Sequence, residues 1–157
     1  MRTPLRLLLV VGALLSGSAR GEAQFIQVTG IQGVDFGSMV PGISKVVSRT
    51  DALSAARFDI KGAGSGRTVE VQFSLPAALT GPGGASLPLS YTAGDAGYSA
   101  QQSIGSQTGF DPRTPFVATL SGNGRASVFL GCRASPAANQ PPGAYSATLT
   151  LSVVYVL

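Results

Sequence analysis

The side chains that could perform acid–base or nucleophilic chemistry are few in this chain. It has no histidine and one cysteine, Cys132. Ser-His-Asp and Cys-His catalysis and most zinc and copper sites depend on imidazole groups, so the sequence excludes these classes of function. The thiol of Cys132 therefore has two roles open to it, as a small buried hydrophobic residue or as a partner in a disulfide between two chains.

Carboxylates are the remaining candidates for catalysis. Outside the first 23 residues they are Asp35, Asp51, Asp59, Glu70, Asp95 and Asp111. A glycoside hydrolase needs two such groups facing one bond, but five of the six stand alone on predicted turns or solvent-facing positions. Asp95 and Asp111 could share a calcium ion across a glycine-rich segment, although we expect both to be solvated. We therefore expect no enzyme activity, no metal and no cofactor.

A glycine-rich stretch, Gly62-Ala63-Gly64-Ser65-Gly66, has the composition of a phosphate-binding loop. Such a loop leads into a helix, and a lysine and a hydroxyl residue follow its last glycine. Here a strand-like pattern follows, and no Gly-Lys-Ser or Gly-Lys-Thr occurs. We interpret the stretch as a hairpin turn.

The N-terminus has the pattern of a secretory signal peptide. Arg2 and Arg6 precede an apolar run at residues 7–15, which is shorter than the roughly 20 residues that span a membrane. Small residues suit cleavage after Ala23 or after Ala19, and we favour Ala23. We predict a signal-peptide helix at residues 1–23, a single domain at residues 24–157 and no membrane span in the mature chain. Export would place the domain in the periplasm, at the cell surface or outside the cell.

The formal net charge of +4 does not indicate a nucleic-acid partner. Without Arg2, Arg6, Arg20 and Glu22 it falls to +2. The basic residues that remain are scattered along the sequence, whereas a phosphate-binding surface needs them clustered.

The mature chain is patterned for strands. Its 21 glycines and 10 prolines suit turns and interrupt helices. Apolar residues alternate with polar ones at residues 68–75, 125–130 and 145–155, which is the period of a strand with one buried face. In the last run the apolar face contains Tyr145, Ala147, Leu149, Leu151, Val153 and Tyr155.

Turn signals separate these runs. Asn123-Gly124 lies between two apolar runs, which predicts a hairpin. Residues 81–84 and 140–143 are further turns, residues 94–112 are a long loop with at most one irregular edge strand, and residues 51–57 are the only helical candidate of the mature chain. The pattern predicts an all-β fold, an immunoglobulin-like β-sandwich of about seven to nine strands.

Two stretches resemble a known family. Residues 34–42, Val-Asp-Phe-Gly-Ser-Met-Val-Pro-Gly, are similar to the opening motif of the bacterial family known as domain of unknown function 4402, through Asp35, Phe36, Gly37, Pro41 and Gly42. Residues 120–124 and 137–145, followed by the last strand, resemble the ending of the same family. The resemblance covers residues 25–155.

The resemblance implies an exported protein without an established activity, related to spore-coat-U and archaic chaperone-usher pilin domains. Pilin subunits of this kind take up an extended segment of the next subunit by β-strand addition. Gly143 and Tyr155 then resemble the glycine and near-terminal tyrosine of pilin ends recognised by a periplasmic chaperone. Residues 25–31 would be a donor strand or, in a self-complete sandwich, its own edge. Pilins usually contain a disulfide, which a single cysteine cannot form within one chain.

Three functions follow as hypotheses. We favour a non-enzymatic structural or surface protein, a pilin-like subunit that binds itself or a periplasmic chaperone. In this reading the strand-exchange edge consists of Gly143, Tyr145, Leu149, Leu151, Val153 and Tyr155. The alternative is a monomeric binding or adhesion module that uses the 94–112 loop with Tyr91, Tyr98 and Phe110. A carboxylate enzyme is the least favoured.

Overall fold

The computed structural model describes residues 25–64 and 66–156, so the predicted signal peptide lies outside the described residues. Twelve strands and one short 3-10 turn make up its regular structure. They are β1 (Ile26–Gln32), β2 (Lys45–Val47), β3 (Ala56–Gly62), β4 (Thr68–Ser74), β5 (Ala78–Thr80), η1 (Pro82–Gly84), β6 (Ser86–Ser90), β7 (Ala96–Ser99), β8 (Thr108–Phe110), β9 (Phe116–Thr119), β10 (Arg125–Leu130), β11 (Cys132–Ala134) and β12 (Thr150–Tyr155). Within these described ranges, no helix has the length and apolar character to cross a membrane.

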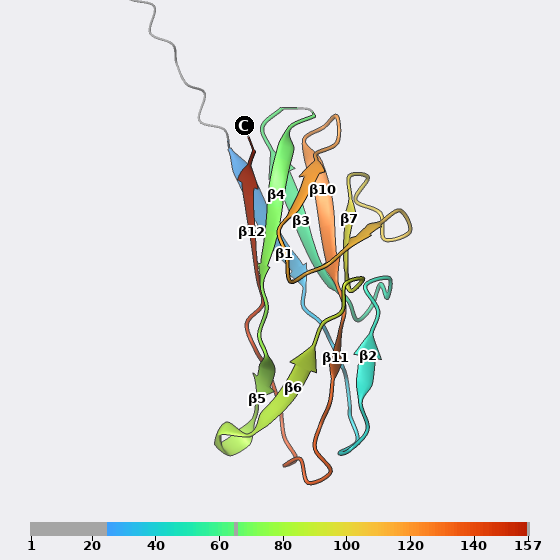
Figure 1. Ribbon diagram of the computed structural model, residues 1–157, viewed down its shortest axis with the longest axis vertical. Coiled ribbons are helices and arrows are strands. Elements are labelled where there is room, and N and C mark those ends of the chain that lie inside the picture. Colours follow the sequence, from blue (N-terminus) through green and yellow to red (C-terminus); the bar gives the residue numbers. More distant parts are fainter. Residues whose placement is uncertain (1–24, 65, 157) are drawn as a thin grey trace, which may run out of the picture.

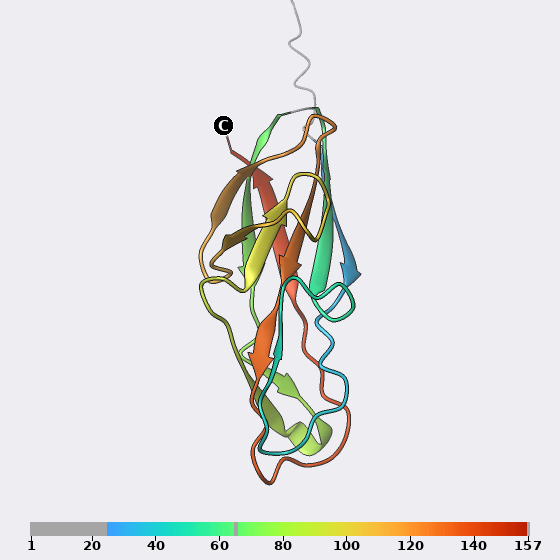
Figure 2. The same ribbon diagram turned by 90° about the vertical axis from the view of Figure 1, so that its right-hand side faces the viewer.

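The strands form three antiparallel sheets in an elongated molecule (Figures 1 and 2). A five-stranded sheet has the order β1-β3-β10-β7-β8, and a three-stranded sheet has the order β12-β4-β9. A four-stranded sheet, β2-β11-β6-β5, continues the fold toward the other end, since β5 follows β4 and β11 follows β10 along the chain. The predicted all-β sandwich is confirmed.

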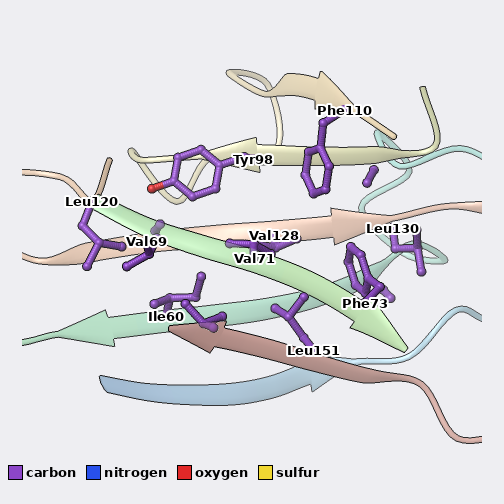
Figure 3. Close-up of a cluster of buried hydrophobic side chains, with 14 residues drawn as sticks. Ile60, Val69, Val71, Phe73, Tyr98, Phe110, Leu120, Val128, Leu130 and Leu151 are labelled. Carbon is purple, nitrogen blue, oxygen red and sulfur yellow. The ribbon is translucent and has the colours of Figure 1, made fainter. Parts of the chain in front are cut away.

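The five-stranded and three-stranded sheets enclose the main core (Figure 3). Val69 and Val71 of β4 are fully buried, as the period-two pattern of residues 68–75 predicts. They meet Ile60 and Val128 of the opposite sheet. A second, smaller cluster under the four-stranded sheet consists of Phe36, Val47, Ala55, Leu87, Cys132 and Ala134.

The strand count exceeds the predicted seven to nine, because long strands are interrupted. Pro76 separates β4 from β5, and a proline cannot donate a ladder hydrogen bond. The loop predicted at residues 94–112 also contains two paired strands, β7 and β8. Residues 51–57 do not form the helix considered from sequence. They make one turn, in which Ala55 N–H donates to Asp51 O, and then enter β3.

The two predicted hairpin turns occur where the sequence predicts them. The prediction that their flanking strands pair with each other is wrong. Residues 62–66 connect β3 to β4, and residues 120–124 connect β9 to β10, but each connection joins strands of different sheets. The Asn123-Gly124 turn does form, since Gly124 N–H donates to Ser121 O at 2.8 Å. Leu120, only 2 % exposed, enters the core beside it, so the chain crosses between layers.

The two long sides of the sandwich differ. On one side, the chain passes from the edge strand β8 to the edge strand β9, and Phe110 stacks on Phe116 at 4.3 Å between ring centroids. On the other side, the edge strands β1 and β12 lie next to each other but do not pair (Figure 1). No ladder therefore closes this side of the sandwich between β1 and β12.

Candidate strand-binding groove

An apolar groove opens where β1 ends and β12 begins. Its upper part, about 360 Å³, contains no charged side chain. It continues into a hollow of about 730 Å³ whose lining has one charged residue, Asp35. The two parts share Val34, Phe36, Leu79 and Ala147. In Figure 2 the walls can be followed as the blue-to-cyan chain after β1 and the red chain before β12.

One wall is the segment that leads into β12. The ladder between β12 and β4 ends at Thr150 and Ser74, and one isolated bridge, Thr80 to Ser146, resumes the pairing beyond Pro76. Residues 147–149 lie between these points and belong to no ladder. The strand predicted at residues 145–155 is therefore too long, and it begins at Thr150. Its inward face is as predicted, since Leu151 and Val153 are buried and Leu149 packs against the core.

The other wall follows β1 and contains the motif that carried the family resemblance. The pairing of β1 with β3 is irregular between Gly30 and Gln32, which leaves Ile31 as a half-exposed bulge on the groove. Farther on, Asp35 N–H donates to Ser54 O, and the Asp35 carboxylate accepts a hydrogen bond from Gly37 N–H at 2.7 Å.

The remaining motif residues shape this wall. Phe36 is buried in the second cluster, and the φ of +56° at Gly37 suits a residue without a Cβ. Pro41 lines the lower hollow. Gly42 N–H donates to Ala137 O, which attaches the wall to the chain leading to β12. The motif therefore builds the groove wall, and its one charged residue, Asp35, is engaged with Gly37 N–H.

A comparison with protein families confirms the resemblance that this motif carried. The model of the family described as "Domain of unknown function (DUF4402)" matches residues 9–155. The chain belongs to this family. No curated protein matches the chain.

The predicted edge residues of this DUF4402 domain lie along the C-terminal segment that leads into β12 and along β12 itself. Gly143, with a φ of +142°, lies against Pro82, and the Tyr145 ring covers Gly81. The Tyr145 hydroxyl donates to Pro141 O at 2.7 Å and accepts from the Gln140 amide. At the opposite end, Tyr155 closes the seam between β12 and β1. The edge is thus fixed at both ends, and within it residues 147–149 belong to no ladder.

The three aromatic residues considered for a ligand loop do not form a common surface. Tyr98 and Phe110 are 6 % and 7 % exposed and belong to the main core. The Tyr98 hydroxyl donates to Thr119 O at 2.7 Å. Tyr91 is half-buried at the groove floor, and its hydroxyl donates to Pro76 O at 2.9 Å. The sequence pattern missed the burial of Tyr98 because it assigned this segment to a loop.

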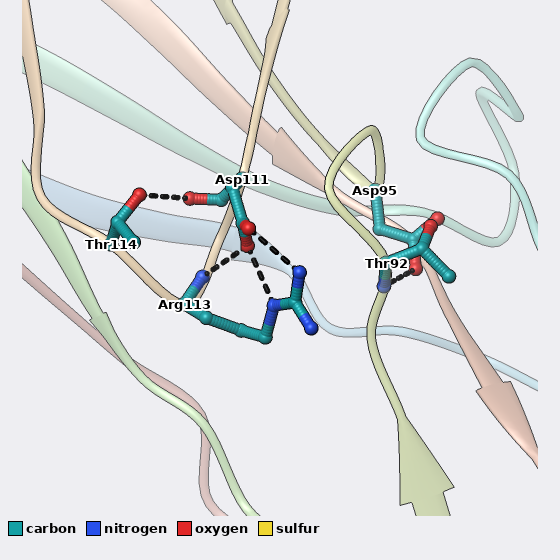
Figure 4. A network of polar contacts seen from close by, with 5 residues as sticks. All are labelled: Thr92, Asp95, Asp111, Arg113 and Thr114. Carbon is teal, nitrogen blue, oxygen red and sulfur yellow. Dashed lines mark hydrogen bonds and ion pairs between the residues drawn. The ribbon is translucent and has the colours of Figure 1, made fainter.

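Asp95 and Asp111 are each engaged in their own turn (Figure 4). Asp95 Oδ2 accepts from Thr92 N–H at 2.6 Å, and Asp111 pairs with the Arg113 guanidinium at 2.7 Å. The hydrogen bonds from the Arg113 side chain lower the pKa of Asp111 to about 2. The described residues contain no cluster of three or more histidine, cysteine, aspartate or glutamate side chains suited to a metal ion.

Cys132 is a free thiol that lines the groove and is only 2 % exposed. This burial agrees with the predicted role of a small buried hydrophobic residue. Burial, and to a lesser degree the negative charge of Asp95, raises the pKa of this thiol to about 12. Burial likewise raises the pKa of Tyr98 to about 12. Both groups therefore remain protonated in the folded protein at pH values where they ionise in the unfolded chain.

These pKa shifts predict destabilisation at alkaline pH. The unfolded chain loses its protons first, from about pH 9 for the thiol and about pH 10 for the phenol. Stability from these groups is therefore complete below about pH 9 and is lost as the pH rises toward 12. Melting temperatures measured from pH 7 to 11 should be level and then fall, and Tyr98→Phe should make the fall above pH 10 shallower. A level curve to pH 11 in the unmodified protein would refute this assignment.

Proposed function

We propose that this DUF4402 domain is an exported structural subunit, not an enzyme, and that its groove binds an extended strand of a second copy. The observation that supports the proposal is the apolar groove between two extended wall segments, one of which, residues 147–149, has no ladder partner. The ionisable side chains among its lining residues are those of Asp35, Tyr91, Cys132 and Tyr145, and burial raises the pKa of the Cys132 thiol, which opposes its use as a nucleophile. Its residues favour binding over chemistry.

A strand is the occupant that fits the shape and polarity of the groove. Alternate amides of an extended chain point to opposite sides. Asp35 N–H is bonded to Ser54 O, just before β3, so we expect the neighbouring amides of Val34 and Phe36, which line the groove, to be directed to its side. An inserted strand can pair with such main-chain groups while its apolar side chains fill the pocket, which is the mode of β-strand addition.

The segment we assign to the second copy is β1. Residues 25–34 contain no charged side chain, which suits a groove with one charged lining residue. Ile26 and Val28 of β1 already pack against the main core of their own subunit, beside β12. The same apolar side chains, in a strand from another copy, are the kind that would fill the groove. Exchange of this kind is head-to-tail and adds copies in a line.

The test is the size of the processed, exported chain in solution as its concentration is raised, measured by sedimentation velocity. We expect large, denaturant-resistant assemblies that grow with concentration. Ile31→Lys should leave the chain monomeric, because it places a charge on the groove. Val117→Lys is the matched control, since Val117 is 54 % exposed and Ile31 is 53 % exposed, but Val117 lies on β9, away from the seam. The proposal fails if the unmodified chain remains a monomer at every concentration, or if both variants assemble equally.

A further inference from the structure

A small hydrogen-bonded cluster closes the upper end of the seam. The Tyr155 hydroxyl donates to Phe25 O at 2.9 Å and accepts from Ala63 N–H at 2.8 Å. Ala63 N–H also donates to Phe25 O at 2.9 Å, so the three groups form a closed triangle. They come from β12, from the residue that precedes β1 and from the residue that follows β3.

Gly62 makes the approach of Tyr155 feasible. A Cβ at this position would lie 2.5 Å from the Tyr155 hydroxyl and 2.6 Å from a Leu120 methyl group. A Cβ essentially never lies closer than 3.0 Å to such atoms, so a side chain at this position would require the Tyr155 ring or the Leu120 side chain to shift. The absence of a side chain at Gly62 therefore lets the ring reach the main chain at Phe25, directly before β1.

We infer that the Tyr155 hydroxyl is a clasp that retains β1 in its own subunit and so limits strand exchange. This inference rests on the proposed function, because it concerns the release of the strand that is exchanged. β1 is an edge strand whose ladder runs along β3 alone, and no ladder joins it to β12. Four of its seven residues are exposed, and the other three, Ile26, Val28 and Gln32, are partly buried. A strand held on one side in this way depends strongly on a contact at its end.

The test compares amide hydrogen exchange in dilute, monomeric protein. Tyr155→Phe keeps the ring and removes the hydroxyl, and we expect the β1 amides to exchange about tenfold faster, as expected for the loss of the clasp hydrogen bonds. Tyr98→Phe is the control. It removes another tyrosine hydroxyl that donates to a main-chain carbonyl, but this one joins β7 to β9. It should leave the exchange of β1 unchanged.

Gly62→Ala is a second variant in which the hydrogen bonds of Tyr155 should be lost, because its methyl group would displace the Tyr155 hydroxyl. We expect fast exchange of β1 in this variant too. Unchanged β1 exchange in Tyr155→Phe, or equal acceleration in Tyr98→Phe, would overturn the clasp.

The rate of assembly is measured separately, for each variant and for the unmodified chain at the same high protein concentration. Faster assembly of Tyr155→Phe than of the unmodified chain supports both the clasp and strand exchange. Fast β1 exchange in a variant that stays monomeric, like the unmodified chain, would uphold the clasp and refute the proposed function. The two failures are therefore distinguishable.

Discussion

Replacing Phe129 by alanine is expected to lower the free energy of unfolding by about 3–5 kcal/mol, the usual range for a fully buried phenylalanine. Phe129 is on the face of β10 opposite to Val128 and Leu130, where a simple sandwich would be open to solvent. Its side chain is nevertheless only 1 % exposed. The Arg57 guanidinium covers the ring at 5.8 Å from its centroid.

Two loops complete the cover. Gly97 is the neighbour of Phe129 across the sheet, and the side chains of Arg49 and Gln107 lie directly over it. Arg49 donates to Gln107 Oε1 at 3.0 Å and to Gly94 O at 2.8 Å, which fixes the cover in place. Removal of the ring would leave a cavity beneath these side chains.

Urea unfolding of Phe129→Ala measures this directly. Leu53→Ala is the control, because Leu53 is 85 % exposed and its loss should change the free energy of unfolding by no more than about 0.5 kcal/mol. A change of that small size in Phe129→Ala would mean that the outer face of β10 is solvated.

Phe129 also illustrates how far the sequence predicts the fold. The period-two pattern of Arg125–Leu130 predicted the strand and its inward residues, and Ala126, Val128 and Leu130 are all buried. It also placed Ser127 and Phe129 together on the opposite face, which is correct. The burial of that face depends on residues far along the chain, Arg49 and Gln107, and a local period contains no information about them.

The turns give a similar result. Asn123-Gly124 predicted a reversal of the chain, and the reversal occurs. Whether the flanking strands then pair or enter different sheets depends on the partners available to each. β9 pairs with β4, and β10 pairs with β3 and β7, so the turn became a crossing between layers.

The groove could be predicted only in part. The apolar face that ends at Tyr155 was evident from the alternation, and so was the motif around Asp35 and Phe36. That these two segments form opposite walls follows from the break at Pro76 and from the bulge at Ile31. The break and the bulge are both features of the sheet register, and the alternation of apolar and polar residues does not predict that register.

A second large effect is expected at the groove walls when copies assemble. Val34, Phe36 and residues 147–149 should be the positions whose amides gain the most protection, because an inserted strand would turn their free edges into ladders. Slowing by at least about tenfold is expected for a newly formed hydrogen bond in a stable sheet. The amide of Asp35 is an internal reference, since it is already bonded to Ser54 O.

The most direct measurement is therefore amide hydrogen exchange of the assembled protein against the monomer, resolved by residue. Our account predicts new protection along both walls of the groove and little change on β8 and β9 at the other side of the sandwich. Protection that appears on β8 and β9 while residues 147–149 continue to exchange freely would contradict it.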